Sequence, residues 1–472
     1  MLDKKAVFIN TASQVIVRFI TLAFTLISIK LLTNYLGAAG VGKYNTITAY
    51  VNLFIVVADL GLFSVTVREI SKNPEKERKI LSNVLVIRLI STILACGVAV
   101  FIVYMTKYDQ QIKLGTLIAT GFLFFNLMAS VYDIALQYRL KMQYSAIAEF
   151  LSKFITILAL YIIIRLNGNF YWIISTIALS GLLIFLFKWL FSTKFIRISA
   201  EYNKSIAKWI FGLSWPFGLI FIVNNLFFKL DTLMLFAIKG ATAVGIYTVA
   251  YKILEVTAFI GSYFSSALKP AFSENISKDK ESISSILSKS IAVMLFIAAP
   301  ITIICIVFSR EIILFLSSPE FISGSYALIL LSFVLPLIYL DGLLGELLIA
   351  NDEKKLLIRI SIFILIFNFV VNLIVIPIYS FMGAAATTLL SQIILLGLKY
   401  HYTKKIIRYN LPKVKIMKIL AISILTLAIG WMIRGLNVNF LILIFLLGTV
   451  YFTLCYLFKL TNLRSIKEIL QS

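Results

Sequence analysis

Charged residues are scarce in this sequence. Only 14% of its 472 residues are Asp, Glu, Lys or Arg, whereas soluble domains carry about 25%. Hydrophobic residues make up 61% of the chain, and the mean hydropathy is +0.99. A water-soluble fold cannot bury so large an apolar excess, so the chain is an integral membrane protein.

The side chains that perform most enzyme chemistry are also few. His401 is the single histidine, and Cys96, Cys305 and Cys455 lie inside apolar runs at unrelated spacings. These spacings predict neither a disulfide nor a metal site. A glycine-rich phosphate loop ending in Lys-Ser or Lys-Thr is lacking, which argues against ATP hydrolysis by this chain. We therefore expect no enzyme activity, no cofactor and no metal.

Alternating segments of about ten residues, which indicate outer-membrane strands, are lacking too. Long unbroken apolar runs take their place, and a membrane-spanning helix needs about 20 such residues. The sequence therefore predicts an all-α polytopic membrane protein. Its fourteen expected helices lie at residues 12–34, 44–67, 80–105, 114–136, 146–166, 170–192, 209–238, 242–268, 286–309, 322–350, 356–378, 383–402, 415–433 and 438–458.

Acidic residues are outnumbered by basic ones, 21 to 44, which gives a net charge of +23. The basic residues concentrate in every second connection between apolar segments, as in 68–79 and 404–418. This alternation follows the positive-inside rule, so we interpret the charge as membrane topology and expect no nucleic-acid partner. It predicts a multi-pass protein of the cell (cytoplasmic or inner) membrane with both termini in the cytoplasm. The expected outer loops are all short, which argues against an enzyme that handles its substrate outside.

One turn occurs twice. Gly-Ala-x-x-Val-Gly-x-Tyr spans 37–44 and 240–247, a shift of 203 residues, and each copy lies between two long apolar segments. The repeat indicates an internal duplication into two parallel lobes of six helices, as in some transporters. It predicts an N-lobe at 1–203, a C-lobe at 204–412 and two additional helices at 413–472. Two such lobes with a cavity between them suit alternating access.

Ionisable residues inside the apolar segments are the strongest functional signal, because each costs roughly 2.5–3.5 kcal/mol at the bilayer centre. The first half holds three embedded cations and one acid, and the second half two Lys–acid pairs: Arg18, Arg88, Lys153 and Asp59, then Lys229, Asp231, Lys252 and Glu255. More cations than anions suit an anionic cargo. We expect Arg18, Arg88, Lys153 and Lys252 to bind it, and the others to balance charge or bind a coupling ion.

Long basic side chains near helix ends can instead extend to the lipid headgroups. We favour this interpretation for Lys30, Lys188 and Lys399. For Arg18, Arg88 and Lys153 both interpretations stay open. Lys252 lies farther from either helix end, which favours a cavity.

Several motifs together resemble one known family. They are Asn10-Thr11-Ala12-Ser13, the turn at 36–44, Asp59-Leu60-Gly61-Leu62 with Arg68-Glu69, Lys229-Leu230-Asp231, the turn at 244–252, and Asn368…Asn372…Pro377…Gly383-Ala384-Ala385. In order and spacing the chain resembles the Wzx-type polysaccharide flippases, which transport O-antigen or exopolysaccharide repeat units. These flippases belong to the multidrug/oligosaccharidyl-lipid/polysaccharide exporter superfamily, which also contains the MATE transporters.

The resemblance implies a fold of fourteen helices in two lobes. It implies as cargo an oligosaccharide linked to a polyprenyl pyrophosphate of the undecaprenyl type, moved from the cytoplasmic to the outer leaflet for surface polysaccharide. Proton or Na⁺ coupling, and polymerase and glycosyltransferase partners, are further expectations. Three alternatives stay open: an ion-coupled drug or metabolite antiporter of the same superfamily, a glycan polymerase or ligase, and a membrane scaffold.

Overall fold

The computed structural model of the chain describes residues 4–196, 198–275, 280–407, 409–436 and 438–460. All regular structure in these ranges is helical. The longer helices are α1 (Lys4–Asp59), α2 (Leu62–Lys72), α3 (Glu77–Met105), α4 (Gln110–Tyr138), α5 (Met142–Arg165), α6 (Phe170–Ser192), α7 (Lys204–Lys239), α8 (Ala241–Ala267), α10 (Lys280–Val307), α12 (Gly324–Ala350), α13 (Lys354–Ile406), α14 (Lys413–Ile433) and α15 (Phe440–Leu457). Shorter pieces are α9 (Lys269–Asn275), α11 (Ser309–Leu316), η1 (Pro74–Lys76) and η2 (Pro319–Phe321).

Each of the fourteen predicted segments falls on a helix. The first segment and most of the second share α1, which is interrupted at Gly37. The eleventh and twelfth share α13, which is interrupted at Ser380. Eleven helical stretches of the described residues are long and apolar enough to cross a membrane. Two of these, Val17–Lys72 and Lys354–Ile406, contain two predicted segments each. The chain is an all-helical, multi-pass membrane protein, as predicted.

One predicted segment is not continuous. The expected helix at 44–67 stops at Asp59, because Leu60 and Gly61 both adopt positive φ angles, of 46° and 73°. The Asp59 carboxylate accepts a hydrogen bond from the Gly61 amide, 3.1 Å away, which stabilises the break. The chain then continues in α2, whose buried face includes Leu62, Val65 and Ile70. The correction matters for function because it places Asp59 at a helix terminus.

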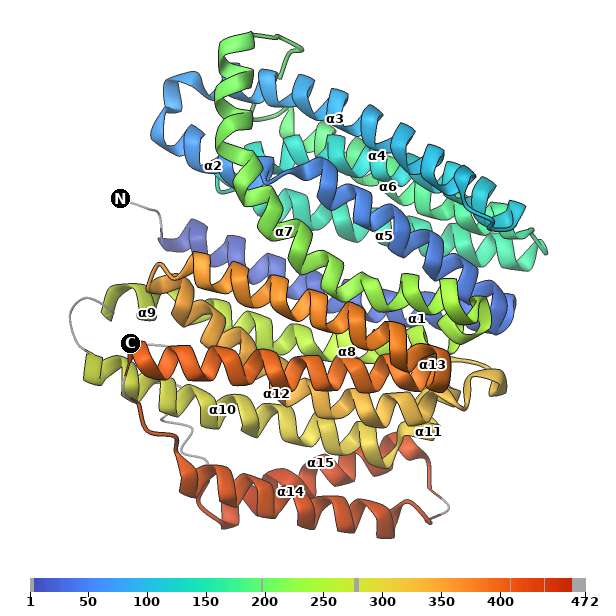
Figure 1. The fold of residues 1–472 in the computed structure, drawn as a ribbon, viewed down its shortest axis with the longest axis vertical. Helices are drawn as coiled ribbons and strands as arrows, with labels where there is room; N and C mark the ends of the chain where they lie inside the picture. Colours follow the sequence, from blue (N-terminus) through green and yellow to red (C-terminus); the bar gives the residue numbers. More distant parts are fainter. Residues whose placement is uncertain (1–3, 197, 276–279, 408, 437, 461–472) are drawn as a thin grey trace. The chain divides into compact units, whose positions relative to one another are not determined.

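The chain divides into two compact units, Met1–Gly245 and Ile246–Ser472. In the first unit α3, α4 and α6 lie side by side, and α1 packs on α5 and α7 (Figure 1). The predicted lobes divide earlier, at 203, and that ancestral division stays a prediction. The compact boundary lies after α7 because Ile206 and Ile210 of this helix pack into an apolar cluster with α2, α3 and α4.

The last two helices belong to the second unit. Val307 of α10, Ile422 of α14 and Leu447 of α15 lie in one buried apolar cluster. Arg434, just after α14, donates to Glu311 of α11 at 3.0 Å. The pair of helices expected at 413–472 therefore packs on α10.

The helix junctions repeat along the chain. Gly37 has φ 64° and ψ −178°, and Gly240, 203 residues later, has φ 80° and ψ −174°. These angles lie in a region that only glycine occupies readily. A second repeat joins α4 to α5 through Leu140 and α12 to α13 through Asp352, with φ angles of 55° and 59°. Equal junctions in the same order support the internal duplication.

Gly240→Ala tests the strain at the repeated junction. A β-carbon at Gly240 would meet no atom within 4 Å, so only the backbone angle opposes it. We expect a loss of about 1–3 kcal/mol of stability, measured as a lower melting temperature of the detergent-solubilised protein. Gly97→Ala is the matched control, since Gly97 lies inside α3 with equally open space. It should be neutral or slightly stabilising, and equal effects at both sites would contradict the strain argument.

Candidate functional site

Arg88 and Asp59 form a buried ion pair at the helix break. The Arg88 side chain is fully buried, and its Nη2 donates to Oδ1 of Asp59 at 2.8 Å. The Asp59 side chain is 24% exposed. Its other carboxylate oxygen accepts a hydrogen bond from the Gly61 amide. Gly218 of α7 approaches the break closely, because a β-carbon on it would lie 2.6 Å from the Leu60 backbone. Four helices of the first unit therefore meet around this pair.

Only part of the hydrogen-bonding capacity of the Arg88 guanidinium is used. Its Nε and Nη1 are buried and have no hydrogen-bond partner among the described residues. The hydroxyl of Thr92, one turn farther along α3, is buried and likewise unpaired. Unpaired buried donors are costly and uncommon, and a guanidinium presents its donors in a planar fork that fits phosphate or carboxylate oxygens. The arrangement is suited to an anionic group.

The other two cations of the first half lie in different environments. Arg18 of α1 is exposed and Lys153 of α5 is half-buried. Their helices are neighbours, because the Phe24 ring lies 5.7 Å from the ring of Phe150 and 6.2 Å from that of Phe154. The three predicted cations thus do not share one burial level. A common patch of Arg18, Arg88 and Lys153 stays a prediction.

The predicted residues of the second half fall in two groups. On α7, Asp231 is buried, at 3% exposure, and Lys229 is half-buried. On α8, Lys252 Nζ lies 2.6 Å from Glu255 Oε2, so the expected pair on one helix face is formed. Both of these side chains are partly exposed, at 36% and 44%. Their roles toward a cargo or an ion stay predictions.

Lys188 does not extend to the surface, although the sequence favoured that interpretation. Its side chain is 5% exposed and its Nζ lies 2.5 Å from Asp133 and 3.2 Å from Glu149. Ser145 donates to the second oxygen of Asp133 at 2.6 Å. The cluster joins α4, α5 and α6, and extension to headgroups is therefore wrong for this lysine.

A similar pair lies in the second unit. Lys399 of α13 approaches Asp341 of α12 to 2.7 Å, with exposed fractions of only 11% and 18%. Glu346 of the same helix lies 4.0 Å from Lys269. The expected extension of Lys399 to the headgroups is also wrong. Both lysines lie on the sixth predicted segment of their half and both aspartates on the fourth. Comparing charges between the two repeats would have indicated these pairs from sequence.

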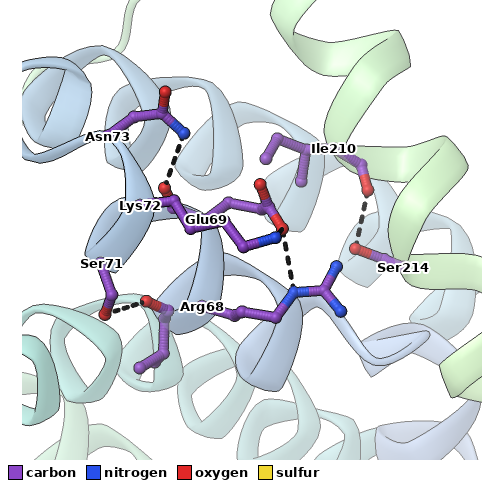
Figure 2. Close-up of polar contacts among 8 residues, drawn as sticks. Arg68, Glu69, Ser71, Lys72, Asn73, Ile210 and Ser214 are labelled. Atoms are coloured by element: carbon purple, nitrogen blue, oxygen red, sulfur yellow. Dashed lines mark hydrogen bonds and ion pairs between the residues drawn. The ribbon is translucent and has the colours of Figure 1, made fainter.

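The resemblance motif Arg68-Glu69 forms a third cluster at the end of α2. Glu69 is buried, and its Oε1 accepts hydrogen bonds from Arg68 Nε at 2.9 Å and from Lys72 Nζ at 3.3 Å. Figure 2 shows both cations turned toward this carboxylate, with Asn73 bonded to the Glu69 carbonyl and Ser214 of α7 nearby. The contacts satisfy a buried carboxylate and hold the end of α2.

Asn368 and Asn372, another motif of the resemblance, form a buried amide pair. Asn372 donates to Asn368 at 3.0 Å, and Asn368 donates to Ser391 at 3.3 Å. Within the described ranges, no group of three or more His, Cys, Asp or Glu side chains is arranged to hold a metal ion.

Comparisons with known proteins identify related chains. A family model described as "Polysaccharide biosynthesis protein" matches residues 5–276, and a model described as MatE matches residues 216–374. An uncharacterized membrane protein of Methanocaldococcus jannaschii is 21% identical, with 93% of each chain covered. The capsular polysaccharide biosynthesis protein CapF of Staphylococcus aureus is 26% identical over 78% of this chain and 91% of CapF. The probable low-salt glycan biosynthesis flippase Agl15 of Haloferax volcanii is 29% identical over 34% of each.

Solved structures share the fold. The lipid II flippase MurJ, in an inward closed conformation, superposes with a TM-score of 0.79 at 18% identity. The match covers 94% of this chain and 98% of MurJ. An inward-facing MATE family multidrug transporter gives a TM-score of 0.61 at 14% identity, covering 86% and 98%. These likenesses confirm the predicted fold class of MATE-like and lipid-flippase-like helical membrane proteins.

Lys188→Met tests the cluster of Lys188, Asp133 and Glu149, which the sequence analysis did not predict. Removing the only lysine between two carboxylates leaves buried charge unpaired, so we expect a loss of about 3–5 kcal/mol of stability. The double variant Lys188→Met with Asp133→Leu should recover part of this loss, because it removes both charges. Lys354→Met is the matched control, since Lys354 pairs with Asp352 at 2.9 Å on an exposed surface and should cost at most about 1 kcal/mol. Melting curves in detergent measure all three, and equal losses for Lys188→Met and Lys354→Met would contradict the buried role.

Proposed function

Since the chain belongs to the polysaccharide biosynthesis protein family, we propose that it is a flippase for a lipid-linked oligosaccharide. The cargo is a repeat unit on a polyprenyl pyrophosphate of the undecaprenyl type, moved from the cytoplasmic to the outer leaflet by alternating access. The family and its flippase relative Agl15 support a transporter and not an enzyme. Glycosyltransferases that supply the cargo and a polymerase that consumes it are the partners this role requires.

The observation that carries the proposal is the buried guanidinium of Arg88. A cation that is embedded in a membrane helix, with two donors lacking a partner, favours an anionic ligand over a cationic drug. Pyrophosphate oxygens match the guanidinium donors in geometry and charge. The flippase Agl15 and the capsular protein CapF support a glycan as the group attached to that phosphate.

Arg88 is covered in this conformation, so its role requires a rearrangement at the break that follows Asp59. Residues with positive φ, as at Leu60 and Gly61, are a usual place for such a change. In the proposal, Arg18 and Lys153 attract the headgroup first, and Arg88 then exchanges part of its hold on Asp59 for the phosphate. Lys252 is the corresponding attracting cation proposed for α8.

The proposal includes coupling of transport to an ion. A carboxylate that loses its arginine to a phosphate gains affinity for a proton or a cation, so Asp59 is the first candidate. Asp231, buried on α7, is the second. Lys229 and Glu255 balance charge beside Asp231 and Lys252 in this scheme, with H⁺ or Na⁺ as the coupling ion.

An antiporter of drugs or metabolites is the second candidate function. The MatE match at residues 216–374 favours it. Export of cationic dyes by the purified protein in vesicles would support the antiporter, and an excess of embedded cations argues against it.

Arg18→Gln together with Arg88→Gln tests the flippase. A hydrogen bond to a charged group contributes about 1.5–3 kcal/mol, so the double variant should lower cell-surface glycan by about tenfold or more. Lipid-linked repeat units should accumulate in the cytoplasmic leaflet while the protein stays in the membrane. Arg165→Gln is the matched control because Arg165 is exposed at the end of α5. Normal surface glycan in the double variant, at normal protein level, would remove both arginines from the mechanism.

A further inference from the structure

A buried carboxylate oxygen of the second unit has no hydrogen-bond donor. Glu346 lies one turn before the end of α12, which the topology prediction places on the cytoplasmic side. Its Oε2 is buried and has no hydrogen-bond partner among the described residues. Lys269 Nζ, at the start of α9, lies 4.0 Å from this oxygen, beyond hydrogen-bond distance. A buried charge without a donor is costly, and a carboxylate loses its charge when it binds a proton.

The end of α8 lies against this part of α12. A β-carbon on Gly261 would lie 2.3 Å from the ring of Tyr339. About one turn farther along both helices, a β-carbon on Gly342 would lie 3.0 Å from the hydroxyl oxygen of Ser265. The contact between α9 and Glu346 follows one turn later. The two helices therefore run side by side down to this carboxylate.

A second unpaired group lies in the same place. Ser265 is 2% exposed, and within the described ranges its hydroxyl oxygen has no hydrogen-bond partner. Buried side-chain oxygens without a partner are uncommon, and this one faces Gly342, one turn before Glu346. A serine hydroxyl can accept a hydrogen bond from a protonated carboxyl group. We refer to Ser265, Lys269, Gly342 and Glu346 as the α8–α12 seam.

The charges beside the seam are balanced. Asp341 of α12 pairs with Lys399 of α13 at 2.7 Å. A β-carbon on Gly345 would lie 3.4 Å from the Lys399 ammonium, so this lysine lies along α12 next to the seam. Glu346 and Lys269 add one charge of each sign. Two lysines near one carboxylate repel a metal cation, so the small, transient ligand that suits Glu346 is a proton.

The other elements packed on α12 contribute further ionisable residues. Lys289 of α10 is half-buried, and Glu274 of α9 is exposed. Arg310 and Glu311 belong to α11, which precedes the start of α12 and so lies at the other end of that helix. In the part of the chain that the structure describes, Lys269 is the charged group that an item of the seam brings nearest to Glu346.

We propose that Glu346 binds a proton from the cytoplasm during the transport cycle. The proposal rests on the flippase function and adds an acid to the coupling candidates Asp59 and Asp231. The proton adds to Oε2, which turns the carboxylate into a neutral carboxylic acid and ends its charge attraction for Lys269. The new O–H group then donates to the Ser265 hydroxyl. Release of the proton restores the first arrangement, so the seam has two states that differ by one proton.

Infrared spectroscopy of the purified full-length chain in lipid nanodiscs tests the proton site without any cargo. On acidification the unaltered chain should gain the C=O band of a protonated carboxyl group, and Glu346→Gln should lack this component. Glu75→Gln is the matched control, because Glu75 is exposed in the other compact unit, and it should keep the band. Ser265→Ala should keep the band at a shifted frequency. A band that is identical in Glu346→Gln would overturn the proton site.

Lys269→Met tests the position of the proton. The Lys269 side chain is 55% exposed, so the fold should tolerate the change. Loss of this cation disfavours the ionised form of Glu346, so the midpoint of the band should move to about two- to fivefold lower proton concentration. Lys79→Met is the control, since Lys79 is exposed in the other unit, and should leave the midpoint unchanged. An unmoved midpoint in Lys269→Met would place the proton elsewhere and contradict the proposal.

Surface glycan shows whether the proton matters for transport. Glu346→Gln should lower cell-surface glycan by about tenfold or more at a normal protein level. Glu346→Asp, which keeps a carboxyl group, should restore most of it, and Glu75→Gln should leave it normal. Normal glycan in Glu346→Gln overturns the role in transport. If the unaltered chain shows the Glu346 band but moves no glycan, the proton site stands and the flippase is refuted instead.

Discussion

A charge that is buried inside this apolar bundle needs a partner within the protein, because the hydrocarbon interior offers neither water nor counter-ions. Arg88 is paired with Asp59, Lys188 with Asp133 and Glu149, and Lys399 with Asp341. Each pair joins different helices, so electrostatics and helix packing stabilise the same arrangement. The pairs differ in one respect that matters for function. The lysines are bound closely by carboxylates, whereas Arg88 keeps two donors unpaired.

That difference separates structural charge from candidate functional charge. A lysine enclosed by two carboxylates contributes to holding α4, α5 and α6 together, and its charge is already matched within the protein. An arginine with a single carboxylate contact has unused donors at a helix break. The break itself comes from the positive φ angles of Leu60 and Gly61, and the close approach of Gly218 covers it. The binding and the mobile parts of the proposed cycle therefore coincide in one region of the first unit.

The predicted duplication would relate several of the remaining features. The junction glycines Gly37 and Gly240 share a backbone conformation. The fourth and sixth predicted segments of each half are joined by a lysine–aspartate pair. The backbones of the two repeated turns approach each other closely at Gly42 and Gly245. A duplication would give equivalent helices the same charged residues and the same junctions, so these features need not have arisen twice.

The sequence by itself determined the membrane class, the fourteen segments and the repeated turn, because hydropathy and glycine spacing act locally along the chain. It also indicated that Asp59 balances an embedded cation and that Lys252 pairs with Glu255. Only the tertiary structure decided that Arg88 is that cation, that Lys188 and Lys399 are enclosed rather than extended to headgroups, and that α7 packs with the first compact unit. The physical reason is that a charge's partner and a glycine's neighbour lie far away in sequence. The periodicity of a helix shows which of its faces is apolar, but it does not show which distant helix packs against that face.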